Sequence, residues 1–104
     1  MNDHKIGSFR PQSIETILTH GGRSPEEQFG FVNTPVFRGS TVLFKTLADL
    51  DAQSQRYLYG RAGNPTTETV EAVVTELEGA YRTKLVPSGL AAITIALMAC
   101  VKAG

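Results

Sequence analysis

The clearest hydrophobic pattern in the chain is a helical one in its second half. Apolar residues stand at positions i, i+3, i+4 and i+7, namely Val70, Val73, Val74 and Leu77, and this spacing is typical of one face of an amphipathic helix. Asn64 is a good N-cap, and Pro65 stands at the first helical position, where proline is tolerated. Gly79 favours termination. The pattern therefore predicts a helix from Pro65 to just before Gly79.

Two shorter helices are predicted nearer the N-terminus. In "SIETILTHGG", Ser13 is an N-cap candidate and the two glycines at 21–22 end the segment. In "TLADLDAQ", Thr46 precedes Asp49 by three residues, an arrangement that favours a helix to about Ser54. Residues 23–44 between them lack periodicity, and "TPVFRGSTVLF" within them is rich in strand-favouring residues. We expect that stretch to be extended without a regular sheet.

The C-terminal part predicts a strand followed by a helix. "AYRTKLVP" is expected to form a short strand that ends at Pro87, after which Ser88 caps a helix that continues to Ala103. This helix is apolar on nearly every face, which predicts burial between layers. Helix, strand and helix in this order predict the opening of an α/β domain. Residues 1–12 are polar and predict a flexible arm.

Composition narrows the classes of partner. The 104 residues are 41% hydrophobic, enough for a small core, and ten basic residues balance ten acidic ones. This balance argues against a nucleic-acid or membrane-surface partner.

No apolar run approaches the roughly 18 residues of a membrane span, and no secretory signal is visible. The two histidines lack metal-ligand spacing, so no metal site is predicted. Cys100, among apolar neighbours, predicts a buried, inert thiol and fits a reducing cytoplasm.

The turn "VPSGLAA" carries the first candidate for ligand binding. Ser88 and Gly89 lie where the predicted strand passes into the predicted helix. The unpaired amides of Gly89, Leu90 and Ala91 and the positive end of the helix dipole would bind an anion such as phosphate. Alternatively, Ser88 only caps the helix and Gly89 only permits the turn. The spacing matches neither the dinucleotide fingerprint nor the nucleotide P-loop.

A second candidate lies in the loop "YLYGRAGN". Arg61 offers a fork of donors that suits phosphate, and the hydroxyl of Tyr59 can add another hydrogen bond. A solvated loop arginine and a tyrosine that anchors the core would give the same pattern. Spacing alone leaves both interpretations open.

Taken together, "YGRAGNPTTETVEAVVTELEG" and "LVPSGLAAITIAL" resemble a known family. They are similar to the N-terminal quarter of the Cys/Met-metabolism enzymes that use pyridoxal 5'-phosphate (PLP). Within this family, "NTPVFRGSTVLF" and "LVPSGLAAI" are most similar to the cystathionine β-lyases. The resemblance implies an α/β fold of fold-type I, like aspartate aminotransferase. Residues 1–60 would be an extended arm that wraps a neighbouring subunit, and residues 61–104 the beginning of the large PLP-binding domain.

The resemblance also implies roles for individual residues. Tyr59 and Arg61 would reach the phosphate of the PLP held by a neighbouring subunit, so the site would be shared across a homodimer or a dimer of dimers. Ser88, Gly89 and Leu90 would bind the phosphate from the helix, with the amides of Gly89 and Leu90 as the main donors. Family members usually carry methionine where Leu90 stands, which matters little if only the amide is used. Tyr59 is also a candidate for proton transfer.

The implied reaction of the full-length protein is β-elimination from a sulfur amino acid, which would convert cystathionine to homocysteine, pyruvate and ammonia. The family's Schiff-base lysine would lie beyond Gly104, and none of Lys5, Lys45, Lys84 and Lys102 stands in a motif that resembles it. We therefore expect an N-terminal segment that is inactive alone. Two alternatives stay open, which are γ-elimination or γ-replacement within the same family and a non-catalytic interaction fragment.

Overall fold

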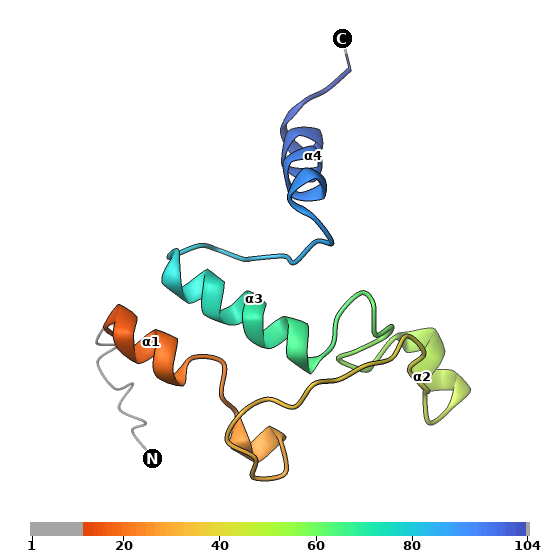
Figure 1. Cartoon of the computed structure of the whole chain (residues 1–104). Coiled ribbons are helices and arrows are strands. Elements are labelled where there is room, and N and C mark those ends of the chain that lie inside the picture. Colours follow the sequence, from red (N-terminus) through yellow and green to blue (C-terminus); the bar gives the residue numbers. More distant parts are fainter. Residues whose placement is uncertain (1–11, 104) are drawn as a thin grey trace, which may run out of the picture.

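The structure of the protein is a computed structural model, in which residues 12–103 are described. The described part of the chain contains four α-helices and one short 3₁₀ turn joined by extended segments (Figure 1). The elements are α1 (Ile14–His20), η1 (Pro25–Glu27), α2 (Leu47–Ala52), α3 (Pro65–Leu77) and α4 (Gly89–Cys100). The flexible arm predicted for residues 1–12 lies almost entirely outside the described residues.

Each α-helix begins at the residue that the sequence predicts. The side chains of four N-caps accept hydrogen bonds from backbone amides of the first helical turn, and these caps are Ser13, Thr46, Asn64 and Ser88. Such bonds satisfy amides that have no partner inside the helix. Gly79 follows α3 with a φ of 58°, a left-handed conformation that glycine adopts at little cost. The predicted helix starts are thus confirmed, whereas α2 ends at Ala52 instead of about Ser54 and α4 ends at Cys100 instead of Ala103.

The packed part of the structure is the contact between α1 and α3. Ile17 of α1 is only 7% exposed. Gly22 follows α1 with a φ of 71°, and a Cβ there would lie 2.4 Å from the Cγ2 atom of Thr69. The hydroxyls of Thr34 and Thr69 lie 3.0 Å apart. The small glycine therefore lets the N-terminal segment approach α3 closely.

Segment 34–44 is extended and forms no regular sheet, as the sequence predicts. It is also hydrogen-bonded to α3. The hydroxyl of Thr66 donates to the carbonyl of Pro35 and accepts from the amide of Phe37, both at 2.8 Å. Thr41 forms a single antiparallel bridge with Tyr59. The first turn of α3 therefore organises both the segment before the Tyr59 loop and, through its cap, the loop itself.

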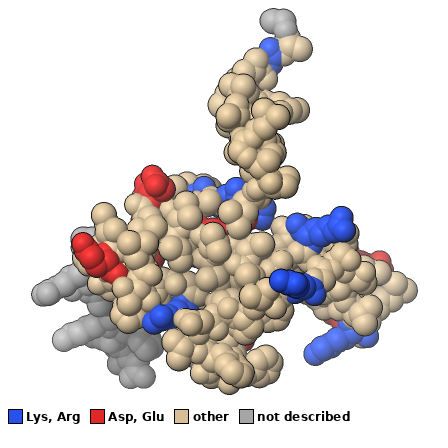
Figure 2. Space-filling model, viewed as in Figure 1, with Lys and Arg blue, Asp and Glu red and all other residues tan. Residues whose placement is uncertain are grey.

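Two sequence predictions about the C-terminal part differ from the structure. The segment 80–87 is not a regular strand, because no other segment among residues 12–103 pairs with it. Helix α4 stands away from the other helices (Figure 1). On the face of α4 that Figure 2 shows, a charged side chain lies only near the C-terminal end of the helix. Its large apolar side chains are exposed, Leu90 to 75%, so the predicted burial of this helix was wrong for residues 12–103. Cys100, predicted to be buried, is exposed for the same reason.

No helix among residues 12–103 has the length and apolar character needed to cross a membrane.

Candidate phosphate-binding site

The loop that carries Tyr59 and Arg61 is fixed on its outer side by the segment before α2. The amide of Gly60 donates to the carbonyl of Ser40 at 2.8 Å, next to the bridge between Tyr59 and Thr41. A Cβ on Gly60 would lie 2.1 Å from the carbonyl oxygen of Gly39. This position requires glycine because two backbones meet there.

The same loop is fixed on its inner side by the cap of α3. The side-chain amide of Asn64 donates to the carbonyl of Gly60 at 3.1 Å. The carbonyl of Tyr59 accepts hydrogen bonds from the amides of Ala62 and Gly63 at 2.9 and 3.2 Å. These contacts use the backbone of the loop and leave the side chains of residues 59 and 61 exposed, Tyr59 to 46%. Neither side chain makes a hydrogen bond within residues 12–103.

The second candidate, the start of α4, presents unpaired donors. The hydroxyl oxygen of Ser88 accepts from the amide of Ala91 at 3.1 Å, so this amide, which the sequence suggested for anion binding, is already used. The amides of Gly89 and Leu90 have no partner among the described residues. A Cβ on Gly89 would meet nothing within 4 Å. An anion can therefore approach these two amides at the positive end of the helix dipole.

The structure does not bring the two candidates together within one chain. The start of α4 lies apart from the loop between α2 and α3 (Figure 1), and α4 packs against no other helix among residues 12–103. The donors form two separate sets, one on a loop that is anchored through its backbone and one at the start of a helix.

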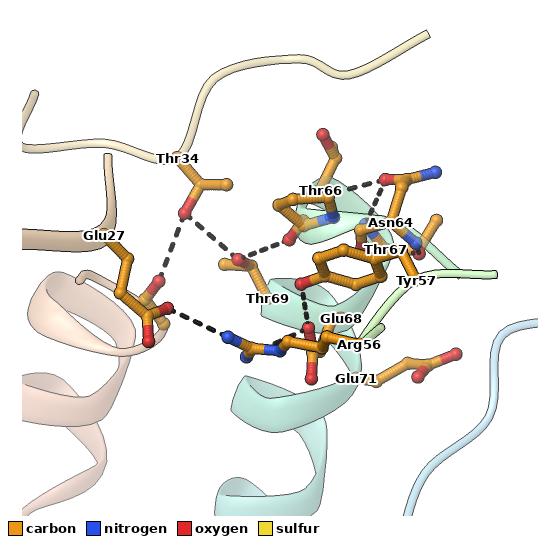
Figure 3. Close-up of polar contacts among 12 residues, drawn as sticks. Glu27, Thr34, Arg56, Tyr57, Asn64, Thr66, Thr67, Glu68, Thr69 and Glu71 are labelled. Carbon is orange, nitrogen blue, oxygen red and sulfur yellow. Dashed lines mark hydrogen bonds and ion pairs between the residues drawn. The ribbon is translucent and has the colours of Figure 1, made fainter. Parts of the chain in front are cut away.

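A polar cluster that the sequence did not predict lies beside the loop, and Figure 3 shows it at α3. The hydroxyl of Tyr57 donates to a carboxylate oxygen of Glu68, and Arg56 contacts the same oxygen at 3.1 Å. Arg56 also pairs with Glu27 at 3.2 Å, and its guanidinium carbon lies 5.5 Å from the centre of the Tyr57 ring. The cluster holds residues 56–57, directly before the loop, against α3 and η1.

The cluster shifts the pKa values of its members in opposite directions. Burial and the neighbouring Glu68 carboxylate raise the pKa of Tyr57 to about 12. The hydrogen bond from Tyr57 and the contact with Arg56 lower the pKa of Glu68 despite its partial burial. Tyr57 is therefore a neutral donor and Glu68 a charged acceptor at neutral pH.

A second carboxylate on α3 holds the segment before α4. One oxygen of Glu71 accepts the amide of Leu85 at 2.9 Å and lies 3.1 Å from the ammonium group of Lys84. Burial acts to raise the pKa of Glu71, but the bonds from Leu85 and Lys84 outweigh it, and the pKa is lowered. Glu68 and Glu71 stand three residues apart, which places them on one face of α3. That spacing is the only signal in the sequence that pointed to them.

Comparison with known proteins places these motifs in a family. Two proteins named "Putative cystathionine beta-lyase" are similar over 91 residues and 88% of this chain. The one from Rhizobium johnstonii is 46% identical, with 23% of its length covered, and the one from Saccharomyces cerevisiae is 47% identical, with 26% covered. An L-alanine/L-glutamate racemase from Wolbachia pipientis is 33% identical over 104 aligned positions, which cover 86% of this chain and 26% of the racemase.

This chain therefore spans about a quarter of the length of these relatives. The sequence model of the family described as "Cys/Met metabolism PLP-dependent enzyme" matches residues 15–104, which include both the Tyr59 loop and the start of α4. The match covers nearly the whole chain and agrees with the identity to the relatives. The chain belongs to the Cys/Met-metabolism family of PLP-dependent enzymes.

Proposed function

We propose that this chain is the N-terminal part of a PLP-dependent carbon–sulfur lyase that cleaves cystathionine by β-elimination. The observation that carries the cofactor-binding part of the proposal is the presence of two sets of exposed hydrogen-bond donors without partners among the described residues. One set is the side chains of Tyr59 and Arg61, and the other is the amides of Gly89 and Leu90 with the Ser88 hydroxyl. Each set suits a phosphate group.

The donors fit the phosphate of PLP in charge and in chemistry. Arg61 offers a cation with several N–H donors, which suits a phosphate dianion. The amides of Gly89 and Leu90 point out of the first turn of a twelve-residue helix, with no side chain at position 89 to obstruct the ligand. The hydroxyl of Ser88 uses its oxygen for the cap and keeps its proton for donation. No carboxylate among the described residues pairs with Arg61 to neutralise it.

The two sets are proposed to meet across a subunit interface. Arg61 and Tyr59 of one subunit would bind the phosphate whose other side is held by Ser88, Gly89 and Leu90 of its neighbour. The separation of the two sets within one chain supports this arrangement. It requires at least a homodimer, in which residues 1–60 form an arm over the neighbour and residues 61–104 open the α/β PLP-binding domain of fold-type I. We place the enzyme in the cytoplasm.

The residues of this chain would bind and orient the cofactor. PLP, when bound, supplies an electron sink for the negative charge that develops on the α-carbon of the substrate. Arg61 and the amides of α4 would fix the position of the ring through the phosphate. Tyr59 would donate to the same phosphate and, if it lies near the reacting nitrogen, would also influence proton transfer there. Tyr59→Phe tests this second role: it should slow elimination while PLP affinity is kept, and unchanged turnover would refute it.

The choice of reaction rests on the similarity to the two relatives named for cystathionine β-lyase. The similarity to a racemase shows that a related segment occurs in proteins named for another reaction. Product analysis separates the alternatives. The full-length protein with PLP should convert cystathionine to pyruvate and homocysteine. Formation of 2-oxobutyrate and cysteine would assign γ-elimination instead, and the absence of carbon–sulfur cleavage would refute the lyase proposal.

A further inference from the structure

Lys84 lies in the segment that leads into α4, and its side chain contacts the Tyr59 loop and helix α3. Its ammonium group donates to the carbonyl of Ala62 at 3.1 Å and lies 3.1 Å from Glu71. Ala62 follows Arg61 directly, and Lys84 stands four residues before the cap Ser88. One side chain therefore links the Tyr59 loop to the segment that leads into α4.

Glu71 is the less exposed partner of Lys84 and holds this contact on α3. Its side chain is 14% exposed, whereas that of Lys84 is 54% exposed. Besides Lys84, the carboxylate accepts the amide of Leu85 at 2.9 Å, so it holds the backbone of the segment as well as the side chain. Glu71 stands in the middle of α3, whose N-terminal cap also holds the loop through the carbonyl of Gly60.

We propose that Glu71 and Lys84 are a positioning pair that holds the Tyr59–Arg61 loop against α3 and so sets the placement of Arg61. Neither residue belongs to the donors that would bind the phosphate, so the pair acts only through the placement of Arg61. The inference rests on the proposed function, because it needs a phosphate whose binding reports that placement.

The expected effect is small because the pair is partly exposed. Exposed ion pairs contribute up to about 1 kcal/mol, which corresponds to about a fivefold change in an equilibrium constant. A charge pair of this strength cannot hold the domain together, but it can select among conformations of a loop that is already anchored at Gly60. A change in cofactor affinity without a comparable loss of stability is therefore the signature of the pair.

The test measures PLP affinity of the full-length protein by titration of the cofactor-free form. Lys84→Met removes the ammonium group and keeps a long side chain, and Glu71→Gln removes the charge and keeps an acceptor for Leu85. Glu76→Gln and Lys45→Met are matched controls, because neither side chain forms a hydrogen bond or ion pair within residues 12–103. The melting temperature of each variant is recorded in parallel.

We expect the dissociation constant for PLP to rise about two- to fivefold in both pair variants and to stay unchanged in the controls. Lys84→Arg, which keeps a cation, should restore most of the affinity. In a double-mutant cycle with Arg61→Ala, the effect of Lys84→Met should largely disappear, because Lys84 acts through the placement of Arg61.

Unchanged affinity in both pair variants, equal shifts in the controls, or full additivity with Arg61→Ala would overturn the inference. If Lys84→Met does not fold, Glu71→Gln and Lys84→Arg still decide it. The proposed function fails separately, when Arg61→Ala alone leaves PLP affinity unchanged. If Arg61→Ala weakens binding and the pair variants do not, only the positioning pair is refuted.

Discussion

The side chain of Asn64 makes two separable sets of hydrogen bonds, one that caps α3 and one that binds the Tyr59 loop. Substitution of this residue tests how the loop is held. Its side-chain oxygen accepts the amides of Thr66 and Thr67 at 3.0 and 3.1 Å and caps α3. Its side-chain amide donates to the carbonyl of Gly60 at 3.1 Å and fastens the loop. Alanine removes both functions, whereas aspartate keeps the cap and loses the donor.

The two substitutions should therefore change the stability of the start of α3 by different amounts. Loss of an N-cap costs about 1 kcal/mol and loss of the bond to Gly60 about another 1 kcal/mol, so Asn64→Ala should destabilise the start of α3 by about 2 kcal/mol. In Asn64→Asp the cap remains, and its negative charge at the helix N-terminus contributes about 0.5 kcal/mol of stabilisation. The aspartate variant should keep α3 but release the loop.

Hydrogen exchange followed by mass spectrometry on the full-length protein separates these effects. In Asn64→Ala, amides at the start of α3 should exchange about 30-fold faster, as about 2 kcal/mol predicts for local opening. In Asn64→Asp they should exchange nearly as in the original protein, while residues 60–63 lose protection. Both variants should bind PLP more weakly, because both free the loop that carries Arg61. An aspartate variant with unchanged loop protection and PLP affinity would refute this reasoning.

Other predictions follow from the same region. Gly60→Ala should weaken PLP binding and lower the melting temperature, because its Cβ would meet the Gly39 carbonyl oxygen at 2.1 Å, whereas Gly63→Ala, with nothing within 4 Å, should be nearly neutral. Because the pKa of Glu68 is lowered in the folded protein, its contribution to stability is present above its ordinary pKa and is lost as pH falls through the lowered value. When melting temperature is measured as a function of pH, the Glu68→Gln variant should lose less stability in acid than the original protein does. Because folding raises the pKa of Tyr57 from 10.0 to about 12, its contribution is lost as pH rises through that interval. Tyr57→Phe should remove this alkaline loss, and an unchanged alkaline profile would contradict the assignment.

Local features of the structure could be predicted from the sequence, and features that depend on distant residues could not. The caps at Ser13, Thr46, Asn64 and Ser88 depend on residues within one helical turn, so their pattern is complete in the sequence. The strand at 80–87 and the burial of α4 require other segments as partners, and residues 12–103 provide none.

The candidate site shows the same division. Sequence reasoning found Tyr59, Arg61 and the start of α4 because each lies in a short motif. It missed Tyr57 with Glu68, eleven residues apart, and Glu71 with Lys84, thirteen residues apart, because charged and hydroxyl groups on a helix face are ordinarily solvated. Only the folded chain shows that these carboxylates bind particular donors.

The central claim is that Arg61 binds the phosphate of the cofactor. Its most direct test compares the affinity of the full-length protein for PLP with that for pyridoxal, which lacks the phosphate. Arg61→Ala should weaken PLP binding about 10- to 150-fold, as loss of a charged hydrogen bond of about 1.5–3 kcal/mol predicts, and leave pyridoxal binding nearly unchanged. Arg38→Ala, at an exposed arginine without a hydrogen bond within residues 12–103, is the control. Equal weakening for PLP and pyridoxal, or unchanged binding of both, would contradict a phosphate-binding role for Arg61.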